Sequence, residues 1–300
     1  MTSNPMSMTV IPDSTIDTDP PKRHWIPYGA YRKGRPTTVR GDIYVYPDFF
    51  SPQLDNRRDI LVYLPRSYFR GRLRYPVVYM HDGQNLFDDH TSFVGEWHID
   101  ESMELLSRES LEAIIVGIPN MGADRLKEYG PFPDPRAEDV RGRAYVAFIA
   151  DTLKPLIDRD FRTHAQRNRT IVMGSSMGGL ISLYAFFARP DVFGAAGVMS
   201  PSLWFGQEAI FDYVRTAPFN PGRIYIDMGK GECLDPEARR RFWKRWRVHG
   251  PCVDARRLFR LLITKGYKRD TQVRYVEAPG DQHNEAAWAR RFPRALRFLL

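Results

Sequence analysis

The strongest chemical signal in this sequence is a serine held between glycines. The segment Gly174-Ser175-Ser176-Met177-Gly178 fits the pattern G-x-S-x-G, follows the apolar run RTIVMG and precedes the apolar stretch LISLYAFF. A short strand, a sharp turn and an immediate helix form a nucleophile elbow, in which small flanking residues let the chain reverse and expose the serine hydroxyl. We therefore predict that Ser176 is a nucleophile, because its neighbour Ser175 occupies the wrong position of the motif.

A serine hydroxyl becomes a good nucleophile only when a neighbouring base takes its proton, and in this arrangement the serine precedes an acid, which precedes a histidine. Of the seven histidines, only His249 and His283 follow Ser176. His249 lies in a run of arginines and tryptophans, whereas His283 lies in a turn between the last predicted strand and the last predicted helix. His283 is therefore the predicted general base.

The acid that orients the imidazole should follow the penultimate strand, Arg223–Met228. Three carboxylates are close enough in sequence, namely Asp227, Glu232 and Asp235. Asp227 lies inside the strand itself, while Glu232 follows a Gly-Lys-Gly turn at its carboxyl end. We predict Glu232, and Asp227 and Asp235 remain alternatives.

The oxyanion of an acyl-transfer intermediate needs two N–H donors. One is the N–H of Met177, which follows the nucleophile at the amino end of the predicted helix. The other should come from the glycine turn His81–Asn85, which follows the strand YPVVYM. We assign it to the N–H of Gln84, with that of Gly83 as the alternative, and expect His81 and Asp82 to hold the turn.

These residues need a scaffold that brings strand ends together. Apolar runs indicate buried strands at Tyr75–Met80, Glu112–Ile118, Arg169–Gly174, Ala195–Ser200, Arg223–Gly229 and Gln272–Ala278. Helical periodicity appears in Asp100–Leu106, Arg141–Asp158, Met177–Ala188, Asp254–Gly266 and Asn284–Leu299. Near-continuous Val and Ile content is typical of parallel strands covered on both faces. With two antiparallel strands at Asp42–Tyr46 and Asp59–Leu64, this predicts an α/β fold with a mostly parallel sheet and helices on both faces.

The chain is expected to hold one domain, residues 28–300, preceded by a flexible polar arm, residues 1–27. The arm is rich in Ser, Thr, Asp and Pro and has no apolar run as long as a signal peptide needs, and no stretch of 18 apolar residues occurs in the sequence. Cys233 and Cys252 form no C-x-x-C pair, so neither a disulfide framework nor a thiolate metal site is expected. A cytoplasmic protein without membrane contact fits these observations.

The charge balance raises the question of a polyanionic partner. With 44 Lys and Arg against 36 Asp and Glu, the formal net charge is +8. The segment Arg239–Arg247 interleaves arginines with Phe and Trp, as single-strand binders do. At helical spacing its aromatic side chains can face inward, so we expect no nucleic-acid partner and consider a cap over the site or a homodimer contact instead. Asp88, Asp89, His90 and His98 match no ligand spacing, so no metal is expected either.

Several longer motifs occur in order along the chain. They are YMHDGQNLFDD (Tyr79–Asp89), GEWHID (Gly95–Asp100), GIPN with RLKEYGPF (Gly117–Phe132), GSSMGG, SPSLWF (Ser200–Phe205), IDMGKGE and GDQHNEAAW (Gly280–Trp288). With them the chain resembles the putative-esterase family of α/β-hydrolases, which includes esterase D, enterochelin esterases, feruloyl and acetylxylan esterases and mycolyltransferases. The resemblance implies a serine hydrolase without cofactor. Its acid position matches Glu232, although many relatives carry Asp there.

The same resemblance suggests residues that line the substrate pocket. Arg125 and Tyr129 match the family's R-x-x-E-Y segment beside the active site, where an arginine is suited to bind a carboxylate or sugar hydroxyl. Pairing of Arg125 with Glu128 is the structural alternative. Trp97 and Trp204, with Trp288, are expected to wall the pocket or to belong to the core.

The predicted activity is hydrolysis of small acyl, aryl or sugar esters through a Ser-His-Glu triad and an acyl-enzyme. Three alternatives remain: hydrolysis of a siderophore lactone, acyl transfer to another alcohol, and binding of a carbohydrate or a partner without catalysis. The sequence names neither the natural ester nor its acyl length, because these depend on loops that spacing does not fix.

Overall fold

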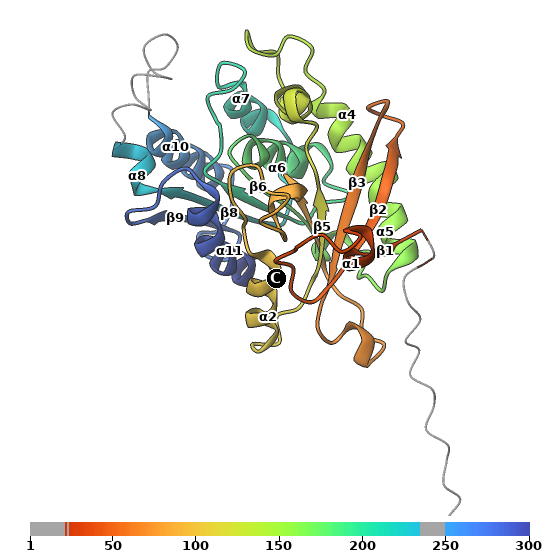
Figure 1. The fold of residues 1–300 in the computed structure, drawn as a ribbon. Coiled ribbons are helices and arrows are strands. Elements are labelled where there is room, and N and C mark those ends of the chain that lie inside the picture. The colour runs from red at the N-terminus through yellow and green to blue at the C-terminus, as the bar shows by residue number, and fades with distance from the viewer. Residues whose placement is uncertain (1–21, 23, 235–249) are drawn as a thin grey trace, which may run out of the picture.

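The core of the molecule is a nine-stranded sheet in the order β1-β2-β3-β5-β4-β6-β7-β8-β9 (Figure 1). The computed structural model describes residues 22, 24–234 and 250–300. The strands are β1 (Ile26–Pro27), β2 (Asp42–Ser51), β3 (Asn56–Leu64), β4 (Val77–His81), β5 (Ile114–Ile118), β6 (Thr170–Ser175), β7 (Ala195–Met199), β8 (Arg223–Gly229) and β9 (Val273–Ala278). From β5 to β9 all neighbours pair in parallel, whereas β1, β2 and β3 run antiparallel. The predicted fold class is confirmed.

The central strands are buried on both faces, which explains their unbroken apolar sequences. Every residue of β4, β5, β6 and β7 is buried. Val78 of β4 pairs with Ile115 of β5 on one side and with Ile171 of β6 on the other. Side chains of this kind have no polar face to offer to water, so helices must cover the sheet on both sides.

Helices pack on both faces of the sheet. They are α1 (Tyr28–Tyr31), α2 (Ile99–Ser107), α3 (Arg125–Tyr129), α4 (Gly142–Ala147), α5 (Lys154–Asp160), α6 (Met177–Ala188), α7 (Ala209–Thr216), α8 (Lys230–Leu234), α10 (Pro251–Thr264) and α11 (Glu285–Leu299). Buried side chains of α4, α6, α7 and α10 share one apolar core, and those of α2 and α11 share the other. Figure 1 shows α2 and α11 next to each other below the sheet. A π-helical turn, Phe148–Leu153, joins α4 to α5, so the predicted helix Arg141–Asp158 is found nearly whole.

The folded part of the chain begins before Tyr28. Trp25 is buried, and Ile26 and Pro27 pair with Val45 and Tyr44 of β2. The ring of Trp25 also packs edge-on against Phe161, with 4.9 Å between the ring centroids. Residues 1–21 and 23 of the predicted arm lie outside the described residues.

The two cysteines form a disulfide, which the sequence analysis did not expect. Cys233 of α8 and Cys252 of α10 are bonded, with their Cα atoms 5.6 Å apart. The expectation of unpaired cysteines is therefore wrong, because residues 19 positions apart in sequence are brought together by two adjacent helices. Disulfides persist in oxidising surroundings, so the cysteines no longer favour a reducing compartment.

Two further expectations concern residues outside the described part of the chain. The first is the cap or homodimer contact predicted for the arginine- and tryptophan-rich segment 239–247. The second concerns Asp235, the alternative acid, and His249, the alternative histidine. In the part that the structure describes, no helix has the length and apolar character needed to cross a lipid bilayer.

Candidate active site

Three side chains selected from the sequence lie in one hydrogen-bonded row. Nε2 of His283 lies 3.0 Å from Oγ of Ser176, and Nδ1 of His283 lies 2.8 Å from Oε2 of Glu232. Because a carboxylate only accepts hydrogen bonds, Nδ1 carries the proton and Nε2 is left to accept from the serine hydroxyl. Ser176 follows β6, Glu232 follows β8 and His283 follows β9, so the carboxyl ends of parallel strands bring the row together.

The turn that carries Ser176 has the strained geometry of an elbow. Ser176 has φ 57° and ψ −119°, a conformation that a non-glycine residue rarely adopts. Its N–H donates to the carbonyl of Met199 and its carbonyl accepts from the N–H of Ser202, each at 3.0 Å. A Cβ on Gly174 would lie 2.8 Å from Cδ2 of His81, so only glycine fits there. The sequence motif therefore reflects crowding as well as backbone freedom.

Glu232 is buried and fully hydrogen-bonded. Its Oε1 accepts from Oγ of Ser200 at 2.6 Å and from the N–H of Gly229 at 2.8 Å, while Oε2 faces His283. Burial alone would raise its pKa, but the contacts with His283, Ser200 and Gly229 outweigh burial and lower the pKa below the usual value. The carboxylate therefore stays ionised beside the imidazole.

A second layer of polar contacts supports Glu232. Oγ of Ser200 accepts from Nε1 of Trp288 and from Nη2 of Arg291, each at 3.0 Å. Arg291 is 5% exposed, and its guanidinium lies 3.1 Å from Asp227, 3.5 Å from Asp281 and 3.6 Å from Glu232. Neither Ser200 nor Arg291 was predicted from the sequence. Ser200 had a signal, because it directly follows a parallel strand at the same edge of the sheet, whereas Arg291 had none.

Asp227, the alternative acid, does not reach the imidazole. It is fully buried within β8 and faces Arg291. Burial raises its pKa to about 7, although the guanidinium of Arg291 works in the opposite direction. This carboxylate belongs to the support of the site rather than to the row.

Of the two residues predicted to supply N–H groups to an oxyanion, Met177 directly follows the serine and Gln84 lines the same cleft as Ser176. Met177 is the first residue of α6, and the first N–H groups of a helix have no partner within it. Gln84 lies in the tight turn Gly83–Asn85, and its side-chain oxygen accepts from the N–H of Asn120 at 3.1 Å. A Cβ on Gly83 would lie 2.5 Å from the backbone nitrogen of Ile118, which explains the glycine.

Ser176 and His283 open into a cleft of about 990 Å³. Its wall combines amides, aromatic rings and a few charged groups, from Asp82, Gln84, Asn85, Thr91, Phe93, Val94, Trp97, Asn120, Gly122, Ala123, Arg125, Ser175, Asn284, Glu285 and Trp288. Phe93 is 87% exposed and Val94 is 58% exposed. The cleft therefore offers apolar surface beside Ser176 and His283.

Three of the five predicted pocket residues line this cleft. Trp97 and Trp288 do, with 5.7 Å between their ring centroids. Arg125 does as well, but its Nε and Nη2 donate to the two oxygens of Asp82 at 2.7 and 2.8 Å. The pairing of Arg125 with Glu128 is not found, because Glu128 binds Arg58 at 2.7 Å.

The other two predicted pocket residues do not line the cleft. Tyr129 is fully buried, and its hydroxyl accepts from the N–H of Asp82 at 3.0 Å. Trp204 lies under the guanidinium of Arg136, 4.0 Å from it. Tyr129 therefore holds the Asp82 turn in place.

His81 serves structure. It is fully buried, with Nδ1 2.9 Å from the hydroxyl of Tyr145 and Nε2 3.1 Å from Oγ of Ser182. Burial lowers the pKa of His81 to about 3, so the ring is neutral near pH 7.

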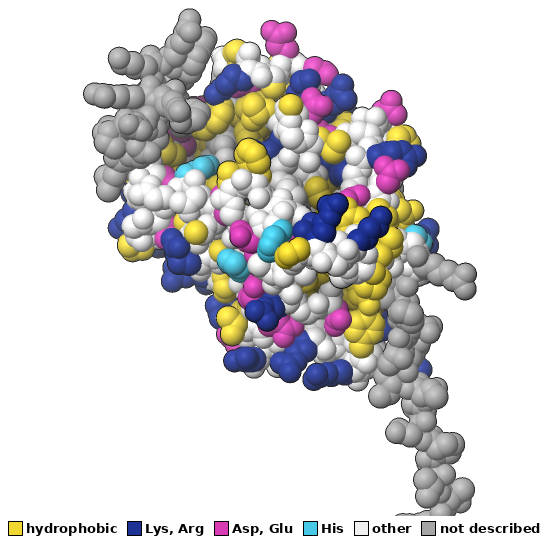
Figure 2. Space-filling model, in the orientation of Figure 1, with side chains coloured by type: hydrophobic (Ala, Val, Ile, Leu, Met, Phe, Trp, Pro, Cys, Tyr) yellow, Lys and Arg dark blue, Asp and Glu magenta, His cyan; other side chains and the backbone are white. Residues whose placement is uncertain are grey.

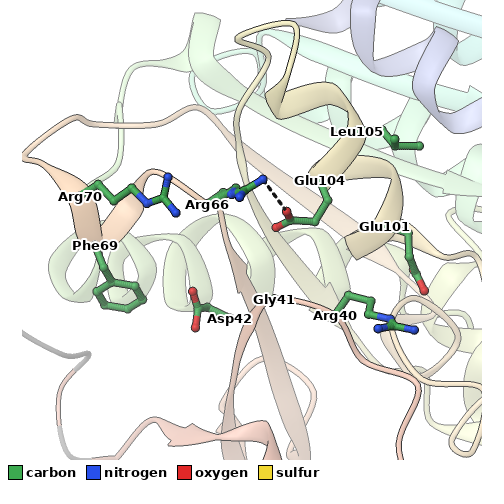
Figure 3. A pocket seen from close by; sticks show the side chains of 9 residues that line it. All are labelled: Arg40, Gly41, Asp42, Arg66, Phe69, Arg70, Glu101, Glu104 and Leu105. Atoms are coloured by element: carbon green, nitrogen blue, oxygen red, sulfur yellow. Dashed lines mark ion pairs between the residues drawn. The ribbon is translucent and has the colours of Figure 1, made fainter.

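A second hollow, of about 710 Å³, contains none of the predicted site residues (Figure 3). It is lined by Arg40, Gly41, Asp42, Arg66, Phe69, Arg70, Glu101, Glu104 and Leu105. Arg66 and Glu104 form an ion pair at 4.0 Å across it.

A serine at a strained strand-to-helix turn, a histidine after the last strand and a parallel sheet define the class: the protein is an α/β-hydrolase. Residues 51–299 match the family described as Putative esterase. The chain therefore belongs to this family of carboxylic ester hydrolases, and the resemblance found in its motifs is confirmed.

Curated relatives cover different shares of the chain. YbbA of Bacillus subtilis, described as uncharacterized, is 25% identical over 250 residues, which are 81% of this chain and 92% of that protein. The ferri-bacillibactin esterase BesA of Bacillus subtilis is 27% identical over 183 residues, 53% of this chain and 60% of BesA.

Solved structures share the fold. The BES protein from Bacillus cereus has a TM-score of 0.65 at 18% identity, covering 88% of this chain and 97% of that one. The siderophore hydrolase EstA from Aspergillus nidulans has a TM-score of 0.65 at 16% identity, with the same two coverages. A ferulic acid esterase has a TM-score of 0.61 at 18% identity, covering 86% of this chain and 97% of that one.

Proposed function

We propose that this protein hydrolyses carboxylic esters through a catalytic triad of Ser176, His283 and Glu232. The observation that carries the proposal is the hydrogen-bonded row, with 3.0 Å between Ser176 and His283 and 2.8 Å between His283 and Glu232, at the mouth of the cleft. Both distances lie within the range over which protons are transferred between side chains.

Each member of the row has one task. Oγ of Ser176 attacks the ester carbonyl while Nε2 of His283 takes its proton, and the tetrahedral intermediate places its negative oxygen against the N–H groups of Met177 and Gln84. His283 then gives the proton to the departing alcohol, which leaves an acyl-enzyme. Water repeats the sequence and releases the acid, and Glu232 stabilises the imidazolium in both halves.

The cleft favours an ester with an apolar or aromatic part and little net negative charge. Trp97, Trp288, Phe93 and Val94 supply apolar surface. Arg125 is neutralised by Asp82, and Glu285 adds a further carboxyl group. Small acyl, aryl or sugar esters fit this balance better than a strongly anionic ferric siderophore, although relatives named as siderophore esterases make the lactone the second candidate.

Hydrolysis of p-nitrophenyl acetate, p-nitrophenyl butyrate and methyl ferulate by the wild type and by Ser176→Ala tests the proposal. Turnover should fall to background in Ser176→Ala, because no other group replaces the nucleophile, and Ser107→Ala on the far helix α2 serves as the matched control. Loss of turnover in Ser175→Ala but not in Ser176→Ala would refute the assignment. A tri-lactone siderophore, offered with and without iron, ranks the second candidate, and a competing alcohol reveals acyl transfer through a new ester.

A further inference from the structure

Three side chains with metal-binding atoms gather outside the catalytic cleft. Glu96, His98 and Glu101 each place one such atom within 4.8 Å of the others. Nδ1 of His98 lies 3.6 Å from Oε2 of Glu96 and 3.6 Å from Oε1 of Glu101. Zinc bound tetrahedrally through nitrogen and oxygen at about 2.1 Å separates neighbouring ligand atoms by about 3.4 Å. Two of the three separations are therefore already close to those of a zinc site.

A buried oxygen without a partner is a second and independent observation. The side chain of Glu96 is 1% exposed, yet its Oε1 has no hydrogen-bond partner among the described residues. Oε2 of Glu101 and Oδ1 of Asp100 are buried as well, but these two carboxyl groups share a hydrogen bond with each other. A buried acceptor left without a donor destabilises the fold, so an ion bound by the Glu96 carboxylate would relieve the cost.

No arginine or lysine among the described residues forms an ion pair with these carboxylates. Arg40 lies beside Glu101 in Figure 3, and no ion pair joins the two side chains. The two ionic contacts of the cluster, from Glu96 and from Glu101, both go to His98. Within the described ranges, the cluster thus joins carboxylates and an imidazole without a paired lysine or arginine.

Contacts behind the cluster hold the carboxylates in place. Oγ1 of Thr38 donates to Oε2 of Glu96 at 2.8 Å, and the N–H of Arg40 donates to Oδ2 of Asp100 at 2.5 Å. Supporting donors of this kind orient metal ligands in proteins. His98 and Glu101 remain partly exposed, with side-chain exposures of 56% and 36%, so an ion has access from solvent.

We infer that Glu96, His98 and Glu101 bind a zinc ion. Imidazole nitrogen together with carboxylate oxygen suits Zn²⁺ better than Ca²⁺, which prefers oxygen alone. In the sequence, Trp97 lies between the ligands Glu96 and His98. Trp97 lines the catalytic cleft, whereas Glu96 and His98 do not line it. The ion therefore fixes the wall of the cleft and does not touch the reacting atoms. This group was not predicted from the sequence, where His98 was grouped with Asp88, Asp89 and His90.

The test is calorimetric titration of Zn²⁺ into the full chain after treatment with a chelator. We expect one ion per chain, a higher thermal midpoint with zinc, and binding weakened by at least about tenfold in His98→Ala and in Glu96→Gln. His90→Ala is the matched control, because His90 is also exposed and lies 3.2 Å from a buried carboxylate, that of Asp88. Co²⁺ in place of Zn²⁺ should give the intense visible absorption of a tetrahedral site.

Four outcomes would overturn the inference. They are the absence of saturable zinc binding, undiminished binding in His98→Ala, binding of Ca²⁺ but not of Zn²⁺, and loss of binding in His283→Ala with retention in His98→Ala. The last result would place the ion at the catalytic row. Ester turnover by the zinc-free protein reports separately on the proposed hydrolase, since the side-chain hydrogen bonds of Ser176 and His283 within the described part of the chain go to each other, to Ser202 and to Glu232.

Discussion

Asp227 and Glu232 lie five positions apart at the end of one strand, and their surroundings give them different tasks. Glu232 holds His283 at 2.8 Å and receives hydrogen bonds from Ser200 and Gly229. Asp227 faces Arg291 at 3.1 Å within the sheet, where burial raises its pKa to about 7. One carboxylate is thus kept ionised next to the imidazole, and the other helps to hold the arginine that supports it.

Replacing Glu232 with Gln separates these tasks. We expect kcat on p-nitrophenyl acetate to fall by about 10³- to 10⁴-fold, because the amide neither stabilises the imidazolium nor selects the tautomer. Asp227→Asn is the matched control, and it should retain far more activity since Asp227 does not contact His283. Steady-state rates of both variants, with circular dichroism to verify folding, decide the point. An equal loss in Asp227→Asn would contradict the assignment.

At the scale of single residues, the hydrogen-bonded row of Ser176, His283 and Glu232 was predictable from the sequence, whereas the residues that support Glu232 were not. A motif, a chain order and a turn identified Ser176, His283 and Glu232 without coordinates. Ser200 binds Glu232 from 32 positions earlier in the sequence. Arg291 in turn binds Ser200, which lies 91 positions before it. Tyr129 was placed in the pocket, although it is a buried hydroxyl that holds the Asp82 turn. Contacts of this kind depend on packing that spacing does not encode.

Strand β4 ends at His81, whose neutral ring packs against the turn that carries Ser176. His81 packs against Gly174 and Gly178 and is hydrogen-bonded to Tyr145 and Ser182. Its pKa is lowered to about 3 by burial. The folded chain therefore binds fewer protons than the unfolded chain between about pH 6.5 and pH 3, and stability rises with pH across that window.

This linkage predicts acid sensitivity. Between about pH 7.5 and pH 5, His81 should reduce the free energy of unfolding by about 2 kcal/mol, because the unfolded imidazole takes up a proton that the folded one refuses. Urea unfolding at both pH values measures the loss. His81→Asn should reduce the difference between the two pH values by about that amount, even if it lowers stability at both. An unchanged difference would count against the buried neutral ring.

Helices α8 and α10 are joined by the disulfide directly after the residue that orients His283. Cys233 follows Glu232 in α8, and its partner Cys252 lies in the first turn of α10. A crosslink that closes a loop of this size is worth about 3 kcal/mol in the entropic account. It also limits how far the five-residue helix α8 can move from its place beside the row.

Removing the crosslink should therefore affect stability and rate together. We expect the double change Cys233→Ser and Cys252→Ser to lower the free energy of unfolding by about 2–3 kcal/mol and to lower kcat more than KM. Reductant should shift the thermal midpoint of the wild type and leave that of the double variant in place. If reductant has no effect on the wild type, the crosslink does not stabilise the protein.

At the scale of the whole molecule, the net charge of +8 is not matched by an excess of positive charge in the lining of the cleft. Residues 235–249 contain six basic and two acidic residues, which account for half of the excess. Within the cleft, Arg125 is bound to Asp82 at 2.7 and 2.8 Å, and Glu285 also lines the wall. On the face shown in Figure 2, the described Lys and Arg side chains are mixed with those of Asp and Glu.

The salt dependence of turnover tests this distribution of charge. Between about 20 mM and 300 mM NaCl, kcat/KM for a neutral aryl ester and for an anionic half-ester should change to a similar extent. Salt weakens electrostatic attraction between an anionic substrate and the protein, and we expect the cleft to exert no such attraction. Arg125→Leu should leave the ratio of kcat/KM for the two esters unchanged, because Asp82 already neutralises Arg125. A rate on the half-ester alone that falls steeply with salt would show that the arginines steer the substrate.

The order of strands and helices was predictable because the sheet is buried on both faces, so apolar runs mark its strands. The start of the fold was not. Residues 24–27 read as a continuation of a polar arm, yet Trp25 is buried against Phe161 and Tyr46, a contact between segments more than a hundred positions apart in one case. The disulfide was missed for the same reason, since its partners meet only through the packing of α10 against α8.

The short strand β1 also bears on the solubility of the chain. It covers Tyr44 and Val45 of β2, a ten-residue strand that ends in Phe49, Phe50 and Ser51 and would otherwise be the edge of the sheet. An uncovered edge with aromatic side chains is a template on which another chain can add a strand. A chain shortened to begin at Tyr28 would keep Ser176, Glu232 and His283 and still be prone to aggregate, because it would lack the strand that covers part of that edge.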